Sequence, residues 1–165
     1  MKTFSIKYTF LMALVALCTS TGFAQISKAE IRATGLTCSM CSNAINKQLK
    51  SMPEAVDVAT DLNTNTFTVT LKDGNSLTPA AFKEKVEKAG FFIGSLVLTV
   101  DAETATKNPY VLVKEVANKS KQVQIQVLDK GYVTDKEFKK VTKTYKSIAS
   151  FNNGNEGDFH VKVLN

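Results

Sequence analysis

The chain has 165 residues, with 21 Lys and Arg against 15 Asp and Glu, and a formal net charge of +6 at pH 7. This length allows one domain of ordinary size or two small ones. A charge this modest, carried by scattered lysines, argues against a nucleic-acid-binding protein and suits one that docks an acidic partner.

The N-terminus has the pattern of an export signal. Lys2 and Lys7 precede an apolar run at residues 10–17, and Gly22 and Ala24 supply small residues around a cleavage point. The apolar run is shorter than the ~20 residues that a membrane-spanning helix needs, and no later stretch approaches that length. We therefore predict a signal peptide at residues 1–24 and a periplasmic or secreted mature protein with no stable membrane insertion. Removal of the signal peptide takes away two basic residues and leaves the mature protein with a net charge of +4.

The chain has three cysteines, Cys18, Cys38 and Cys41. Cys18 follows the apolar run, as a lipid-attachment cysteine does, but Leu17 stands where lipoprotein processing requires a small residue. We therefore expect Cys18 to be discarded with the signal. The other two are too near each other to close a long loop, which excludes a framework of stabilising disulfides. The pair therefore serves a chemical role or is incidental.

Residues 29–100 carry six successive secondary-structure patterns. Two have apolar residues at helical spacing, and four alternate between apolar and polar residues, as strands do. The predicted elements are a strand (29–35), a helix (42–52), two strands of a hairpin (56–62 and 66–71), a helix (79–89) and a strand (95–100). This order predicts an α+β, ferredoxin-like βαββαβ fold, with both helices on one face of an antiparallel sheet.

Residues 101–165 are expected to form a small C-terminal β-rich extension of unknown role. After a polar linker, the patterns suggest three strands, at residues 110–113, 123–128 and 160–163, and one helix at residues 135–145. The lysines from Lys136 to Lys146 are expected to form a solvated helix face, with a docking surface for an acidic partner as the alternative. The one histidine, His160, lies on the last strand and is expected to be structural.

The segment Gly35-Leu36-Thr37-Cys38-Ser39-Met40-Cys41 carries the most specific pattern. It resembles the G-M-T-C-x-x-C loop of the heavy-metal-associated domain, which is found in copper chaperones and in the N-terminal tails of metal-pumping ATPases. The resemblance covers about residues 28–100, includes the order of elements, and extends to the turn Ala89-Gly90-Phe91. It implies a heavy-metal-associated domain at residues 25–100, with Cys38 and Cys41 as the metal ligands and Phe91 as a shield of the site, with a core ring as the alternative role of Phe91. Leu36 replaces the family's methionine, a near-isosteric change that should preserve the loop.

The spacing of Cys38 and Cys41 has a physical rationale of its own. Two thiolates separated by two residues at the start of a helix can converge on one ion, and the positive helix end favours the thiolate form. Soft sulfur ligands select copper(I), whereas a structural zinc site needs four ligands. The family's zinc-type members have aspartate at the position of Thr37. Copper(I) is therefore the expected ion, with zinc, cadmium, mercury and silver as alternatives, and Met40 is expected to be a solvent-exposed spacer.

These features predict an exported metal-binding protein that sequesters copper(I) or transfers it to a metal-transporting or metal-accepting protein. No nucleophile–base pair, carboxylate dyad or phosphate loop is visible in the sequence, so we predict that it is not an enzyme. Two alternatives stay open. One is a thiol–disulfide oxidoreductase that uses the same cysteines, since exported compartments are oxidising, although Thr37 and the order of elements speak against it. The other is an interaction module that keeps the fold and does not use the metal site.

Overall fold

The computed structural model describes residues 25–36, 39–114, 120–146, 148, 150–151 and 157–164. The predicted signal peptide, with Cys18, lies outside the described residues, and so do Thr37 and Cys38. In the described part of the chain, no helix is both long enough and apolar enough to cross a lipid bilayer.

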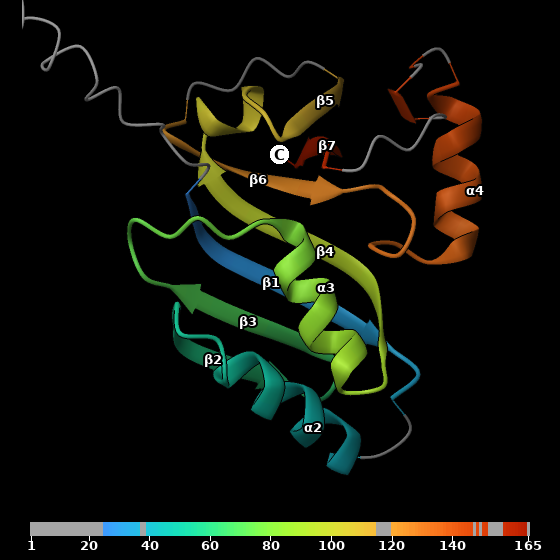
Figure 1. Cartoon of the computed structure of the whole chain (residues 1–165). Helices are drawn as coiled ribbons and strands as arrows, with labels where there is room; N and C mark the ends of the chain where they lie inside the picture. The colour runs from blue at the N-terminus through green and yellow to red at the C-terminus, as the bar shows by residue number, and fades with distance from the viewer. Residues whose placement is uncertain are drawn as a thin grey trace, which may run out of the picture.

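The described residues form one seven-stranded sheet, flanked by helices (Figure 1). The first six elements are β1 (Ile26–Thr34), α2 (Ser39–Lys50), β2 (Ala55–Asp61), β3 (Thr66–Leu71), α3 (Pro79–Lys88) and β4 (Phe92–Asp101). They are followed by the 3-10 helix η1 (Thr104–Thr106), β5 (Tyr110–Lys114), β6 (Gln122–Val127), α4 (Asp135–Thr144) and β7 (Phe159–Leu164). The strand order is β2-β3-β1-β4-β6-β7-β5. The predicted α+β fold, with a ferredoxin-like βαββαβ order and a small C-terminal β-rich unit, is confirmed.

The N-terminal half is organised around β1, which pairs antiparallel with both β3 and β4. Its alternating pattern turns Ala29 and Ile31 toward α2 and α3, which cover this face of the sheet in Figure 1. The helices contribute side chains that are fully buried: Ile45, Leu49, Phe82 and Val86. Each such side chain contributes roughly 1.5–3 kcal/mol when it is removed from water. This apolar layer holds α2 in place.

The C-terminal strands continue this sheet beyond β4. β6 pairs antiparallel with β4 from Val97↔Gln126 to Asp101↔Gln122, β7 pairs antiparallel with β6, and β5 runs parallel to β7 at the outer edge. Because β6 covers the edge of β4, the extension shares a sheet with the first half and does not form a separate layer. The domain boundary between residues 100 and 101 stays a prediction.

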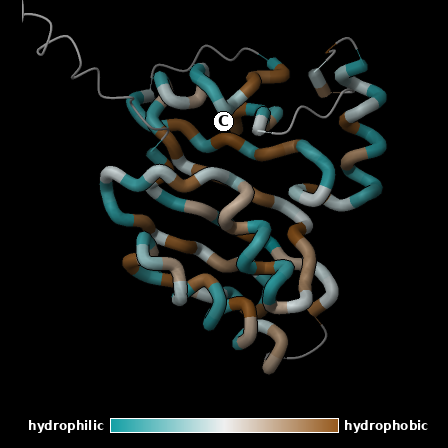
Figure 2. Tube along the Cα trace, viewed as in Figure 1, coloured by the Kyte–Doolittle hydropathy of each residue, from teal (hydrophilic) through white to brown (hydrophobic). Residues whose placement is uncertain are grey.

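Helix α4 packs on the face of the sheet opposite α2 and α3. Ile125 of β6 is paired with Leu98 and belongs to the core beneath α2 and α3, so the next residue, Gln126, points to the other face. There the Gln126 amide donates a hydrogen bond to Glu137 of α4. A second apolar cluster under α4 contains Leu128, Val141 and Phe151. Figure 2 shows that α4 is predominantly hydrophilic, so this helix has a narrow buried face.

Gly94 lies in β4 between Ile93 and Ser95, at a register shift in the pairing of β4 with β1. A Cβ at this position would lie 2.5 Å from Cγ2 of Thr34 and 3.4 Å from the carbonyl oxygen of Arg32. Gly94→Ala is therefore expected to lower the free energy of unfolding by about 1–3 kcal/mol, the usual cost of overpacking, as measured by urea denaturation. Thr34→Ser removes the clashing methyl group and should recover most of this loss in the double variant. If the double variant is no more stable than Gly94→Ala, the clash is with the backbone carbonyl of Arg32 and not with the Thr34 methyl group.

Candidate metal site

The loop between β1 and α2 is shaped by the residues on its two sides. β1 ends at Thr34, and Gly35 then adopts φ +84°, a left-handed conformation that glycine adopts without steric cost. Leu36 is half-buried and packs against the main core, as expected of an apolar residue that replaces methionine beneath the loop. The chain is thus turned back over the sheet within a few residues, and α2 begins at Ser39.

Cys41 lies in the first turn of α2 and is half-buried. The helix was predicted over residues 42–52 but runs from Ser39 to Lys50, because the first turn carries no apolar periodicity that would reveal it. The turn contains no acidic residue, so the positive end of the helix is not neutralised there. Ser42, which is 4% exposed, and the buried Ile45 fix the orientation of this turn on the sheet. The Cys41 thiol therefore lies at the N-terminal end of α2, at the edge of the buried core.

The neighbours of the loop match their expected roles in part. Met40 is 79% exposed, as predicted, and its role as a spacer stays a prediction. Phe91 is half-buried, and its Cδ1 atom lies 3.9 Å from where a Cβ on Gly35 would stand. The ring therefore borders the loop on the side of β4. Because Cys38 lies outside the described residues, its geometry relative to Cys41, and the shielding of the pair by Phe91, stay predictions.

His160 lies on β7, separated from β1 by β4 and β6, and is 2% exposed. Its Nδ1 atom lies 2.8 Å from Oδ1 of Asp129, and its Nε2 atom lies 2.9 Å from Oγ of Ser150. The carboxylate can only accept a hydrogen bond, so Nδ1 carries a proton, and in the neutral ring the Ser150 hydroxyl donates to Nε2. The ring also packs against Phe151 at a centroid distance of 4.8 Å. These contacts satisfy a buried histidine and support its structural role; Asp129 and Ser150 were missed because they are distant in the sequence.

The comparisons with known proteins concern the part of the chain that contains both cysteines. The family model of the heavy-metal-associated domain matches residues 30–92. Residues 30–92 are a heavy-metal-associated domain. The domain begins within β1, includes the cysteine loop and both helices that cover the core, and ends at the first residue of β4.

Several relatives of this heavy-metal-associated domain are copper proteins. The chain is 34% identical over 76 residues to the copper-exporting P-type ATPase of Bacillus subtilis (strain 168), in an alignment that spans 46% of this chain and 9% of the ATPase. It is similar to the yeast copper transporter domain Ccc2a, solved in the apo and Cu(I)-loaded states, with 34% identity, 39% of this chain and 86% of that chain covered, and a TM-score of 0.35. It is also similar to the N-terminal domain of a potential copper-translocating P-type ATPase from Bacillus subtilis in the Cu(I)-loaded state, with 28% identity, 41% and 82% covered, and a TM-score of 0.36. The chain thus spans only a small part, 9%, of the length of the copper-exporting ATPase that it matches.

Proposed function

We propose that this chain is an exported, non-enzymatic protein that binds copper(I) between the thiolates of Cys38 and Cys41 and either sequesters the ion or passes it to an acceptor protein. The observation that carries the proposal is the position of Cys41, in the first turn of α2 and within the matched heavy-metal-associated domain. The copper(I)-loaded states of similar domains support the choice of ion. Thiolate sulfur is also the ligand type that selects copper(I).

Transfer by ligand exchange requires no redox step. Two cysteines leave the ion with a low coordination number, so a thiolate of the acceptor can bind it before either Cys38 or Cys41 is released. Each new sulfur–copper bond replaces an existing one, and copper stays in the +1 state throughout. The location of Cys41 at the end of the sheet, next to the exposed Met40, suits such an approach.

The experiment that tests the proposal is an anaerobic titration of the reduced mature protein with copper(I), in competition with a chromogenic chelator. We expect one ion per monomer. A protein that instead fails to bind copper(I), exchanges disulfides rapidly and has a reduction potential between about −270 and −120 mV would be an oxidoreductase. A protein that binds a partner protein but neither binds copper(I) nor exchanges disulfides would be an interaction module. Export is tested separately, since the mass of the protein recovered from its native cells should correspond to a chain that starts at Gln25.

The apoprotein should be folded. The core beneath α2 and α3 is built from apolar side chains that do not contact a metal, with Phe67, Phe82 and Leu49 all fully buried. Copper(I) should therefore add stability by mass action, about 2.7 kcal/mol at a free concentration of 100 Kd, and should not create the fold. Circular dichroism of the metal-free, reduced protein checks this. A random-coil spectrum that becomes ordered on addition of metal would contradict it.

A further inference from the structure

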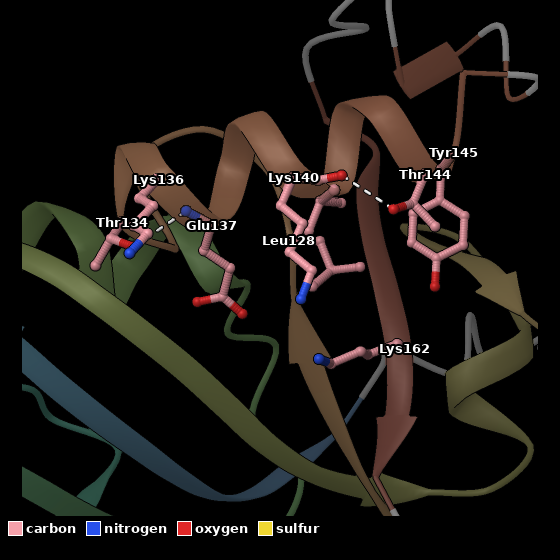
Figure 3. A pocket seen from close by; sticks show the side chains of 9 residues that line it. Leu128, Thr134, Lys136, Glu137, Lys140, Thr144, Tyr145 and Lys162 are labelled. Carbon is pink, nitrogen blue, oxygen red and sulfur yellow. Dashed lines mark hydrogen bonds between the residues drawn. The ribbon is translucent and has the colours of Figure 1, made fainter.

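A groove lies between α4 and the strands beneath it, on the opposite face of the sheet from α2 and α3. It has a volume of about 450 Å³, with the buried Leu128 and Val141 as its apolar floor. In Figure 3, Glu137 and Lys140 extend from α4 toward the strands, and Lys162 extends from β7 beneath them. The sequence revealed the lysines of α4 but not that Lys162 would join them, because β7 follows α4 by more than a dozen residues.

The charges in this groove do not balance. Lys136, Lys140 and Lys162 line it together with one carboxylate, Glu137, which leaves a net charge of +2. Within the described residues, none of the three lysines forms an ion pair. The Glu137 carboxylate instead accepts a weak hydrogen bond, 3.4 Å long, from Gln126. The groove therefore presents to an incoming ligand two ammonium groups from α4 and a third, that of Lys162, from the strand beneath.

We propose that this groove binds an acidic, extended peptide segment of a partner protein. Lys136 and Lys140 are one helical turn apart, which separates their Cβ atoms by about 6 Å. Alternate side chains on one side of an extended peptide are about 6.6 Å apart. Acidic residues at alternate positions can thus pair with Lys136 and Lys140, while Lys162 reaches the segment from below. The peptide's intervening apolar atoms would lie over Val141 and the half-buried Tyr145, which also lines the groove.

The shape and charge of the groove favour a peptide over other polyanions. A flat anionic membrane would meet the rim of a concave site and would not reach Lys162 at its base. The phosphates of nucleic acid would lie against the Glu137 carboxylate, which lines the groove. The surface is independent of the cysteines, so the apoprotein and the copper-loaded protein should bind the peptide equally well.

The test uses the full mature chain and a fluorescent peptide with three glutamates at alternate positions, with a glutamine version as its control. Fluorescence anisotropy should show binding of the acidic peptide that weakens with added salt, and no binding of the glutamine peptide. Lys140→Gln and Lys162→Gln should each weaken binding by about three- to fivefold, as expected for a partly exposed ion pair. Glu137→Gln should tighten it by a similar factor because it removes a like charge from the groove.

Charge-matched variants on the other face of the sheet provide the control. Lys47→Gln and Lys50→Gln, at exposed positions near the end of α2, change the net charge by the same amount and should leave the affinity unchanged. If Lys47→Gln or Lys50→Gln weakened peptide binding as much as Lys140→Gln does, the proposal would be overturned, because binding would then depend on the net charge of the protein and not on the groove. The proposal would also fail if single-stranded DNA or phosphatidylserine vesicles bound as tightly as the peptide and depended equally on Lys140 and Lys162.

Discussion

Cys38→Ser and Cys41→Ser should each abolish tight copper(I) binding by the reduced protein. A serine hydroxyl is a hard, neutral ligand at neutral pH, so each variant leaves one thiolate where the ion needs two. We expect the affinity to fall by at least about 1,000-fold, or ~4 kcal/mol. Anaerobic competition with a chromogenic copper(I) chelator measures this loss. The variants should stay folded because Cys41 is half-buried at the surface end of α2 and does not belong to the core.

Met40→Leu is the matched control for these variants. It removes the one sulfur between the two cysteines and keeps both thiolates, and its side chain is exposed in the wild-type protein. The copper(I) affinity should therefore stay within about twofold of the wild-type value, well under 1 kcal/mol. Retention of tight binding by the double variant Cys38→Ser/Cys41→Ser would show that the ion is held elsewhere and would remove the basis of the proposed function.

Truncation after Val100 should separate stability from metal binding. The fragment loses β6, whose Ile125 and Val123 lie beside Leu98 and Val100, both fully buried in the complete chain. Because these side chains would regain contact with water, at roughly 1.5–3 kcal/mol each, the free energy of unfolding should fall by about 3–5 kcal/mol. The copper(I) affinity should stay within about tenfold, or ~1.4 kcal/mol, since the cysteine loop lies outside the deleted part.

The full-length variant Ile125→Ala is the control for this truncation. It weakens the packing of β6 against β4 without removing the extension, and should cost about 2–5 kcal/mol with unchanged copper(I) affinity. Urea denaturation followed by circular dichroism measures both losses. If the fragment is folded but binds copper(I) more than tenfold more weakly, the extension contributes to the site. If it does not fold at all, residues 25–100 are not an autonomous domain.

Much of the fold could be predicted because it depends on local patterns. Alternation in β1 and β3 and helical spacing in α3 identified these elements, and Pro79 and Gly90 marked where α3 begins and ends. The first turn of α2 was missed because Ser39-Met40-Cys41 has no apolar periodicity, and its helical form depends on the loop that precedes it. The position of Cys41 relative to the helix end was thus known only approximately from the sequence.

The sequence by itself was enough to predict the candidate metal site, because the two cysteines lie on one short segment and their spacing is a covalent property. It also determined the order of the elements, through the period of the apolar residues. The tertiary structure alone decided where the C-terminal strands pair, since β4 has two edges and a strand pattern does not say which chain segment will cover the second one. It likewise decided that Lys162 meets α4 and that Asp129 and Ser150 meet His160. Such contacts join residues far apart along the chain, and they form only when packing of the whole sheet brings the segments together.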